Sequence, residues 1–142
     1  MGAAMGIDSA GVRVGIDVVS VSEVEAAVAR FGPRYERLLF TDGERDDAPP
    51  APRSRAESLA ARFAAKEAAF KVLRPAPGGA PRWRDVEVRR HPQGWCEILL
   101  RGGAASLARQ AGLGRWSVSL THHGDVAAAV VAAVEGPAAW TS

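Results

Sequence analysis

The sequence is poor in cysteine and aromatic residues, and it has no long apolar run. The single cysteine, Cys96, excludes an internal disulfide and a zinc site built from several thiolates. One thiol also agrees with a reducing cytosol. No segment approaches the roughly 20 apolar residues of a membrane-spanning helix, and residues 1–11 lack the basic and apolar parts of a secretory signal. We therefore expect a cytoplasmic protein without a membrane segment.

The chain also has little net charge, because 18 basic and 16 acidic residues leave only +2 at pH 7. Basic and aromatic residues do not gather on one recognisable face, so a nucleic-acid binder is disfavoured. The basic residues still suffice to hold one phosphorylated ligand. With 142 residues, 47% of them apolar, the chain fits one globular domain. We assign this domain to residues 12–135, between a flexible leader (1–11) and a C-terminal tail (136–142).

Periodicity and turn signals predict an α+β fold. Ser22, followed by Glu25, has the spacing of a helix capping box, and Thr41 is expected to cap a short third helix. The expected strands cover 12–19, 84–90, 95–101, 116–121 and 125–134, and the expected helices begin near 22, 33 and 41 and cover 54–73 and 103–111. This order predicts one mixed or antiparallel sheet packed on the long helix 54–73.

The long helix carries charges beside its packing stripe. At about 100° per residue, Lys66 falls inside the apolar stripe and Glu67 borders it. Lys71 follows Glu67 by one turn on the same flank. The plain alternative is an i,i+4 pair on a solvated face, which stabilises a helix by roughly 0.2–0.5 kcal/mol. The apolar stripe consists of Leu59, Phe63, Phe70 and Leu73.

The first strand offers a second carboxylate. Its apolar residues alternate, so Asp17 points to the other face, where Gly15 leaves room. Asp17 and Glu67 form a plausible oxygen-ligand pair for Mg²⁺, with Lys66 and Lys71 for phosphate oxygens. Arg62 is either a further phosphate ligand or a surface residue. Likewise, the pair His122-His123 is either a solvated turn or a contact for a phosphate or base.

These residues, taken in order, resemble the holo-[acyl-carrier-protein] synthase family, the short single-domain class of 4′-phosphopantetheinyl transferases. The resemblance covers residues from about 12 to 135 and preserves the order and spacing of the motifs. The motifs that carry it are Gly15-Ile16-Asp17-Val18-Val19, Arg62-Phe63-Ala64-Ala65-Lys66-Glu67-Ala68 with Lys71, Trp83-Arg84-Asp85-Val86-Glu87-Val88, and Ser119-Leu120-Thr121-His122.

The resemblance implies the fold of these transferases and a Mg²⁺-dependent reaction with coenzyme A. In that reaction the 4′-phosphopantetheine arm moves to a serine of an apo carrier protein, and adenosine 3′,5′-bisphosphate is released. The resemblance also implies a homotrimer with each active site between two subunits. The alternative is a coenzyme A or nucleotide-binding module, or a trimeric scaffold, that keeps the fold without catalysis. The intact Asp17, Glu67 and Lys71 argue against this alternative.

The resemblance also implies roles for individual residues. Asp17 and Glu67 would hold Mg²⁺ on the diphosphate, and Glu67 would help to take the proton of the serine. Lys71 would stabilise and protonate the departing phosphate. The remaining ligand-binding residues would be Lys66 and Arg62, on phosphate oxygens, and His122, near the adenosine 3′-phosphate.

The chain departs from the family pattern at three places. An arginine that meets the acidic carrier is replaced by Glu23, and an acid after the late histidine is replaced by His123. The Gly-Thr-Gly after the second lysine is absent, and Gly78 and Gly79 in a longer loop are its candidate substitutes. These departures suggest a specialised partner, such as a polyketide-type carrier rather than the carrier of fatty-acid biosynthesis.

Overall fold

The computed structural model describes residues 11–139. Almost all of the predicted leader (1–11) and the last three residues of the predicted tail (136–142) lie outside this range. Within it, the chain forms the helices and strands of an α+β fold, as predicted. The helices are α1 (Val21–Phe31), α2 (Pro33–Leu39), α3 (Asp42–Asp47), α4 (Pro52–Leu73), the 3₁₀ turn η1 (Trp83–Asp85) and α5 (Gly102–Gln110); the strands are β1 (Val12–Ser20), β2 (Val86–Arg90), β3 (Cys96–Leu100), β4 (Leu113–His123) and β5 (Val126–Glu135).

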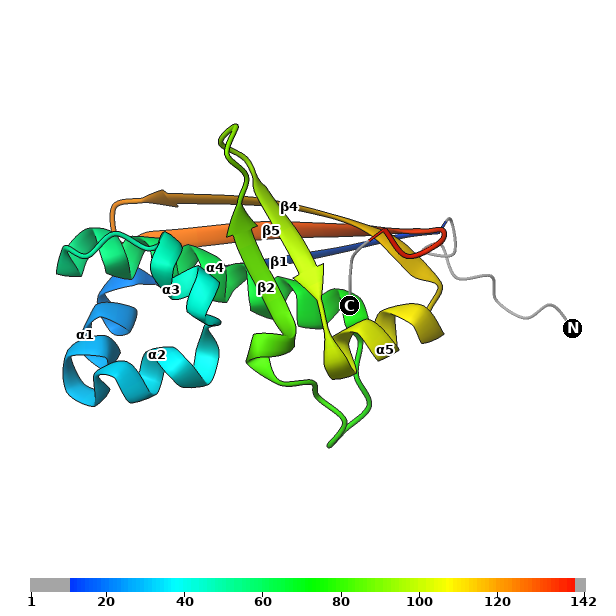
Figure 1. Ribbon diagram of the computed structural model, residues 1–142, viewed down its shortest axis with the longest axis horizontal. Helices are drawn as coiled ribbons and strands as arrows, with labels where there is room; N and C mark the ends of the chain where they lie inside the picture. The colour runs from blue at the N-terminus through cyan, green and yellow to red at the C-terminus, as the bar shows by residue number, and fades with distance from the viewer. Residues whose placement is uncertain (1–10, 140–142) are drawn as a thin grey trace, which may run out of the picture.

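The predicted single sheet is in fact two sheets. Strands β1, β5 and β4 form one antiparallel sheet in the order β1-β5-β4, and β2 pairs only with β3 in a separate hairpin. Helix α4 packs on β1 and β5 and also contacts β2, so it lies between the two sheets (Figure 1). Helices α1 to α3 gather at one end of the molecule and α5 lies toward the other (Figure 1).

Side-chain caps and first-turn prolines explain where α1, α3 and α4 begin. Thr41 caps α3 through a complete capping box with Glu44, as predicted. The predicted Ser22 cap is wrong, because α1 begins directly after β1 and its cap is Ser20, which accepts a hydrogen bond from the backbone of Glu23. Helix α4 begins at Pro52, since a proline needs no amide partner in the first turn.

Gly15 lets β1 lie directly on α4. A Cβ at this position would be 2.2 Å from the carbonyl oxygen of Ala68, so only glycine permits the observed approach. Asp17, two residues on, points to the same side. The opposite face of β1 carries apolar side chains that are 44% to 64% exposed. They are Val12, Val14, Ile16 and Val18.

Among residues 11–139, no helix combines the length and apolar character that crossing a membrane would require.

Candidate active site

The structure brings Asp17, Glu67 and Lys71 together between β1 and α4. The ammonium group of Lys71 donates to the carbonyl oxygen of Ile16 at 2.8 Å and to Asp17 Oδ1 at 3.1 Å. Glu67 lies within hydrogen-bonding reach of Asp17. The other carboxylate oxygen, Asp17 Oδ2, is buried and accepts no hydrogen bond. The site therefore has more negative charge and more acceptors than its own donors satisfy.

The two carboxyl groups differ in their proton affinity. Burial, helped by the hydrogen bond and charge of Asp17, raises the pKa of Glu67 to about 7. Burial also opposes ionisation of Asp17, but the hydrogen bonds from Glu67 and Lys71 outweigh it and hold the pKa of Asp17 below its usual value. Near neutral pH the two carboxylates would repel each other if both were ionised, so their close approach requires a shared proton or a bound cation.

This donor set fits Mg²⁺. The ion is commonly held in proteins by one or two carboxylates, with water and substrate phosphates completing its shell. Asp17 Oδ2 is buried and accepts no hydrogen bond, as expected for a carboxylate oxygen that binds a cation. No group of three or more metal-ligating side chains occurs within the described range 11–139. A cation here would thus need further oxygens from its substrate or from water.

Lys66 does not join this site. Its side chain is fully buried, and it donates to Glu44 Oε1 at 2.8 Å and to the carbonyl oxygens of Trp83 and Val86. These contacts use all three hydrogens of the ammonium group, so none remains for a phosphate. Burial lowers the pKa of Lys66, although Glu44 opposes this effect. The predicted phosphate role of Lys66 is not supported, and an ion pair within the chain explains the residue instead.

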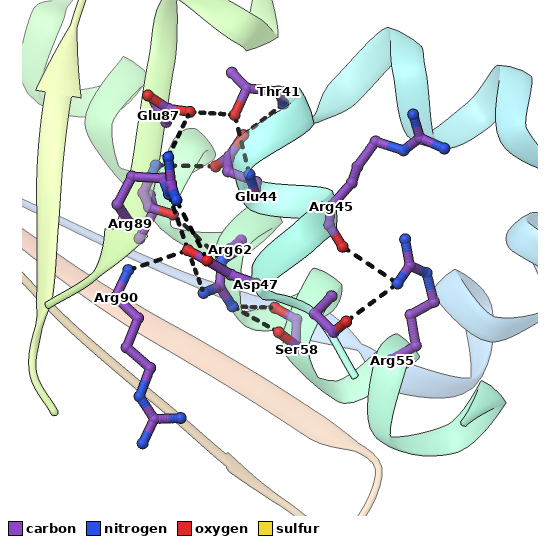
Figure 2. A network of polar contacts seen from close by, with 12 residues as sticks. Thr41, Glu44, Arg45, Asp47, Arg55, Ser58, Arg62, Glu87, Arg89 and Arg90 are labelled. Carbon is purple, nitrogen blue, oxygen red and sulfur yellow. Dashed lines mark hydrogen bonds and ion pairs between the residues drawn. The ribbon is translucent and has the colours of Figure 1, made fainter. Parts of the chain in front are cut away.

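Glu44 is the centre of a buried polar network (Figure 2). Its carboxylate also accepts from the amides of Thr41 and Val88, both at 2.9 Å. Beside it, Glu87 accepts from the Thr41 hydroxyl and from Arg101 at 2.8 Å. Burial opposes the ionisation of Glu87, but these two donors keep its pKa below the usual value. The network ties α3 and β2 to the buried side of α4.

Arg62 and His122 lie at a different place from Asp17. Arg62 is buried, and it donates to Ser58 Oγ at 2.6 Å and to the carbonyl oxygen of Val88 at 3.3 Å (Figure 2). His122 Nδ1 lies 3.2 Å from Glu57 Oε2. Both line a cavity of about 310 Å³, whose lining does not include Asp17, Glu67 or Lys71. The predicted site residues thus fall into two groups.

An aromatic shelf borders Glu67. Trp83 stacks on Phe70 with ring centroids 4.7 Å apart, and it meets Phe63 at 5.0 Å. Phe63 and Phe70 precede and follow Glu67 by one turn of α4, so they share its flank. Trp83 also lines a cleft of about 930 Å³ between α2 and η1. Other residues of this cleft are Arg37, Leu38, Arg82, Arg84 and Arg101.

The glycines of the loop after α4 are exposed and stand apart from other side chains. Gly78 has a positive φ of 76°, and a Cβ there would meet nothing within 4 Å. Gly79 donates its amide to the carbonyl oxygen of Ala76 at 2.8 Å, which closes a turn. In the structure, turn geometry accounts for these two glycines.

Three contributors escaped the sequence analysis. Glu44 was detectable as a capping-box partner of Thr41, but its pairing with Lys66, 22 residues later, leaves no local signal. Glu57 and Asp125, which hold His122 and its turn, also act across the chain. Spacing along one helix or strand cannot reveal such contacts.

Sequence comparisons identify relatives over nearly the whole chain. Residues 13–131 match the sequence model of the 4′-phosphopantetheinyl transferase superfamily. A holo-[acyl-carrier-protein] synthase of Salinispora arenicola is 46% identical over 122 residues, which are 86% of this chain and 97% of the relative. One of Herpetosiphon aurantiacus is 39% identical over 127 residues, covering 82% of this chain and 94% of the relative.

Solved structures of similar fold carry the same name. The Helicobacter pylori holo-[acyl-carrier-protein] synthase in complex with coenzyme A has a TM-score of 0.74 and 26% identity, over 85% of this chain and 99% of that one. The Mycobacterium tuberculosis acyl carrier protein synthase has a TM-score of 0.62 and 36% identity, over 87% and 96%.

Proposed function

This chain belongs to the 4′-phosphopantetheinyl transferase superfamily and, within it, to the holo-[acyl-carrier-protein] synthase enzymes, and we propose its reaction in detail. It transfers the 4′-phosphopantetheine arm of coenzyme A to a serine of an acyl-type or peptidyl-type carrier protein. The reaction depends on Mg²⁺ and releases adenosine 3′,5′-bisphosphate. The lone free thiol of Cys96 suits the reducing cytoplasm that we propose as its location.

One observation carries this proposal. Asp17 and Glu67 meet beside Lys71, and Asp17 Oδ2 is buried without a donor. A bound Mg²⁺ would be held by Asp17 and Glu67 and would neutralise the diphosphate for attack. A chain that only bound coenzyme A would have little need for such a pair.

Glu67 and Lys71 have separate roles in the proposed reaction. The serine hydroxyl forms a bond to the phosphorus that bears the pantetheine arm, and the bond from that phosphorus to the bridging oxygen breaks. Glu67 accepts the serine proton directly or through a water molecule. Lys71, half-exposed beside Asp17, stabilises and protonates the departing phosphate.

We propose that the active enzyme is a homotrimer. The exposed apolar face of β1 continues onto β5 through Val126 and Val130, and an apolar patch of this kind is suited to a subunit contact. The two separate groups of site residues give a second reason. Asp17, Glu67 and Lys71 of one subunit and Arg62 and His122 of another would together hold one coenzyme A, with His122 near its 3′-phosphate.

The carrier protein is proposed to dock at the cleft between α2 and η1. The lining of this cleft combines four arginines with three acidic residues, Asp42, Asp85 and Glu87, and its Trp83 belongs to the aromatic shelf beside Glu67. By contrast, α1 exposes Glu23, which repels an acidic partner. Arg37→Glu should therefore raise the KM for the carrier and leave the affinity for coenzyme A unchanged. An unchanged carrier KM would remove the cleft from the docking site.

Intact-mass analysis tests the function as a whole. The protein is incubated with coenzyme A, Mg²⁺ and a panel of apo carrier proteins, and each carrier should gain the mass of one phosphopantetheine when it is a substrate. Transfer to polyketide-type carriers would support the specialised partner suggested by Glu23 and His123, whereas transfer to the fatty-acid carrier alone would exclude it. No transfer to any carrier would favour a binding module.

A further inference from the structure

A chain of polar contacts links the start of α4 to the end of β4, and of its members the proposed function uses only His122. Glu57 Oε2 contacts His122 Nδ1 at 3.2 Å, while Glu57 Oε1 contacts Arg53 Nε at 3.4 Å. The Glu57 side chain is 25% exposed, against 49% for that of His122. One half-buried carboxylate therefore joins an arginine to the imidazole.

The turn after His122 is anchored directly by Asp125 and Arg53. Asp125 accepts from the amide of Ser22 at 2.9 Å and from its hydroxyl at 2.7 Å. Arg53 reaches the carbonyl oxygen of Gly124 at 3.1 Å and Asp125 Oδ1 at 3.3 Å. Since these contacts fix the backbone at the end of β4, the contact of Glu57 acts on the orientation of the imidazole.

The imidazole lies at a cavity suited to a phosphate. Nδ1 faces Glu57, so Nε2 is the nitrogen left to meet a ligand. The charged groups that line the cavity are Asp47, Glu57, Arg62 and Arg90, and its hydroxyl groups are those of Ser54, Ser58 and Thr121.

We propose that Glu57 is a positioning residue that orients the His122 imidazole so that the enzyme prefers ligands bearing a 3′-phosphate monoester. The proposal rests on the proposed function, in which that monoester is the 3′-phosphate of coenzyme A. Glu57 itself touches no substrate; it acts through His122. Its loss should therefore affect ligands with the monoester and spare those without it.

Calorimetric titration of two product-like ligands tests the proposal. Adenosine 3′,5′-bisphosphate carries the 3′-phosphate, and adenosine 5′-monophosphate carries only a 5′-phosphate. Glu57→Gln should weaken the bisphosphate about five- to tenfold, as expected for one charge-supported contact, and change the monophosphate less than twofold. In a His122→Ala background, Glu57→Gln should add no further loss.

Glu25→Gln is the matched control, because Glu25 also pairs with Arg53, at 3.4 Å, but is not a partner of His122. It should change neither affinity, whereas losses equal to those of Glu57→Gln would mean that the Arg53 network as a whole matters.

Equal weakening of both ligands by Glu57→Gln, or an undiminished effect in the His122→Ala background, would overturn the proposal. Its failure is separable from that of the proposed function. A wild-type protein that transfers the arm without preferring the bisphosphate contradicts only the role of Glu57. One that prefers the bisphosphate but modifies no carrier contradicts only the proposed function.

Discussion

Lys66 and Glu67 are neighbours on α4, yet their charged groups differ in how completely the surrounding residues satisfy them. Lys66 is fully buried, and Glu44 and two carbonyl oxygens satisfy each of its hydrogens. Glu67 meets a second carboxylate, Asp17, whose buried Oδ2 has no donor. A buried charge whose hydrogen-bonding partners are all present has a structural role, whereas one that lacks partners indicates a site for a ligand that the chain itself does not supply.

The largest expected effect comes from breaking the buried ion pair between Lys66 and Glu44. Lys66→Met leaves the carboxylate of Glu44 buried without its cation, so we expect it to lower the free energy of unfolding by about 3–5 kcal/mol. Urea denaturation measures this loss. The double variant Lys66→Met/Glu44→Gln should recover part of it, because the buried charge is removed as well. A single variant as stable as the wild type would show that the ion pair is not structural.

The next largest effect comes from changing Glu67, which faces the unsatisfied carboxylate of Asp17. Glu67→Gln removes a residue proposed as both metal ligand and base, and kcat should fall about 10²–10³-fold, equivalent to roughly 3–4 kcal/mol. The circular dichroism spectrum should not change, since no described partner depends on this carboxylate for folding. Glu97→Gln on β3 is the control and should keep the wild-type kcat. A Glu67→Gln enzyme of normal rate would remove Glu67 from the site.

The third effect separates the two elements that form the site. Gly15→Ala places a Cβ 2.2 Å from the carbonyl oxygen of Ala68, so β1 must move away from α4. Overpacking of this kind costs about 1–3 kcal/mol, and kcat should fall because Asp17 moves with the strand. In Gly112→Ala the new Cβ meets nothing, although φ is 70°; it should cost about 1 kcal/mol and leave kcat unchanged. Equal kcat values for the two variants would contradict this account.

The site between β1 and α4 could be anticipated better than its surroundings. Asp17 and Glu67 each follow a regular period, so the faces they occupy could be predicted from spacing alone. Lys66 was placed correctly in the packing stripe but was assigned to phosphate, because its true partner, Glu44, lies 22 residues away across a helix boundary. The division into two sheets was also missed, since strand pairing depends on contacts that periodicity does not encode.

The smallest expected effect, the pH dependence of stability caused by Glu67, gives the most direct test. The pKa of Glu67 is raised from its model-peptide value of 4.5 to about 7, so its contribution to stability is present at pH 4.5 and is lost as the pH rises through 7. Asp17, whose pKa is lowered, contributes stability throughout this window and loses it only as the pH falls below the window. Without Mg²⁺, the wild type should lose about 1 kcal/mol relative to Glu67→Gln between pH 5 and pH 8, after allowance for solvent screening.

The decisive measurement is therefore the free energy of unfolding of wild type and Glu67→Gln between pH 5 and pH 8, with and without Mg²⁺. We predict that the wild type alone becomes less stable as the pH rises, and that Mg²⁺ restores it while leaving Glu67→Gln unchanged. Parallel pH profiles that Mg²⁺ shifts equally or not at all would contradict the claim that Asp17 and Glu67 form an unsatisfied pair built for a cation.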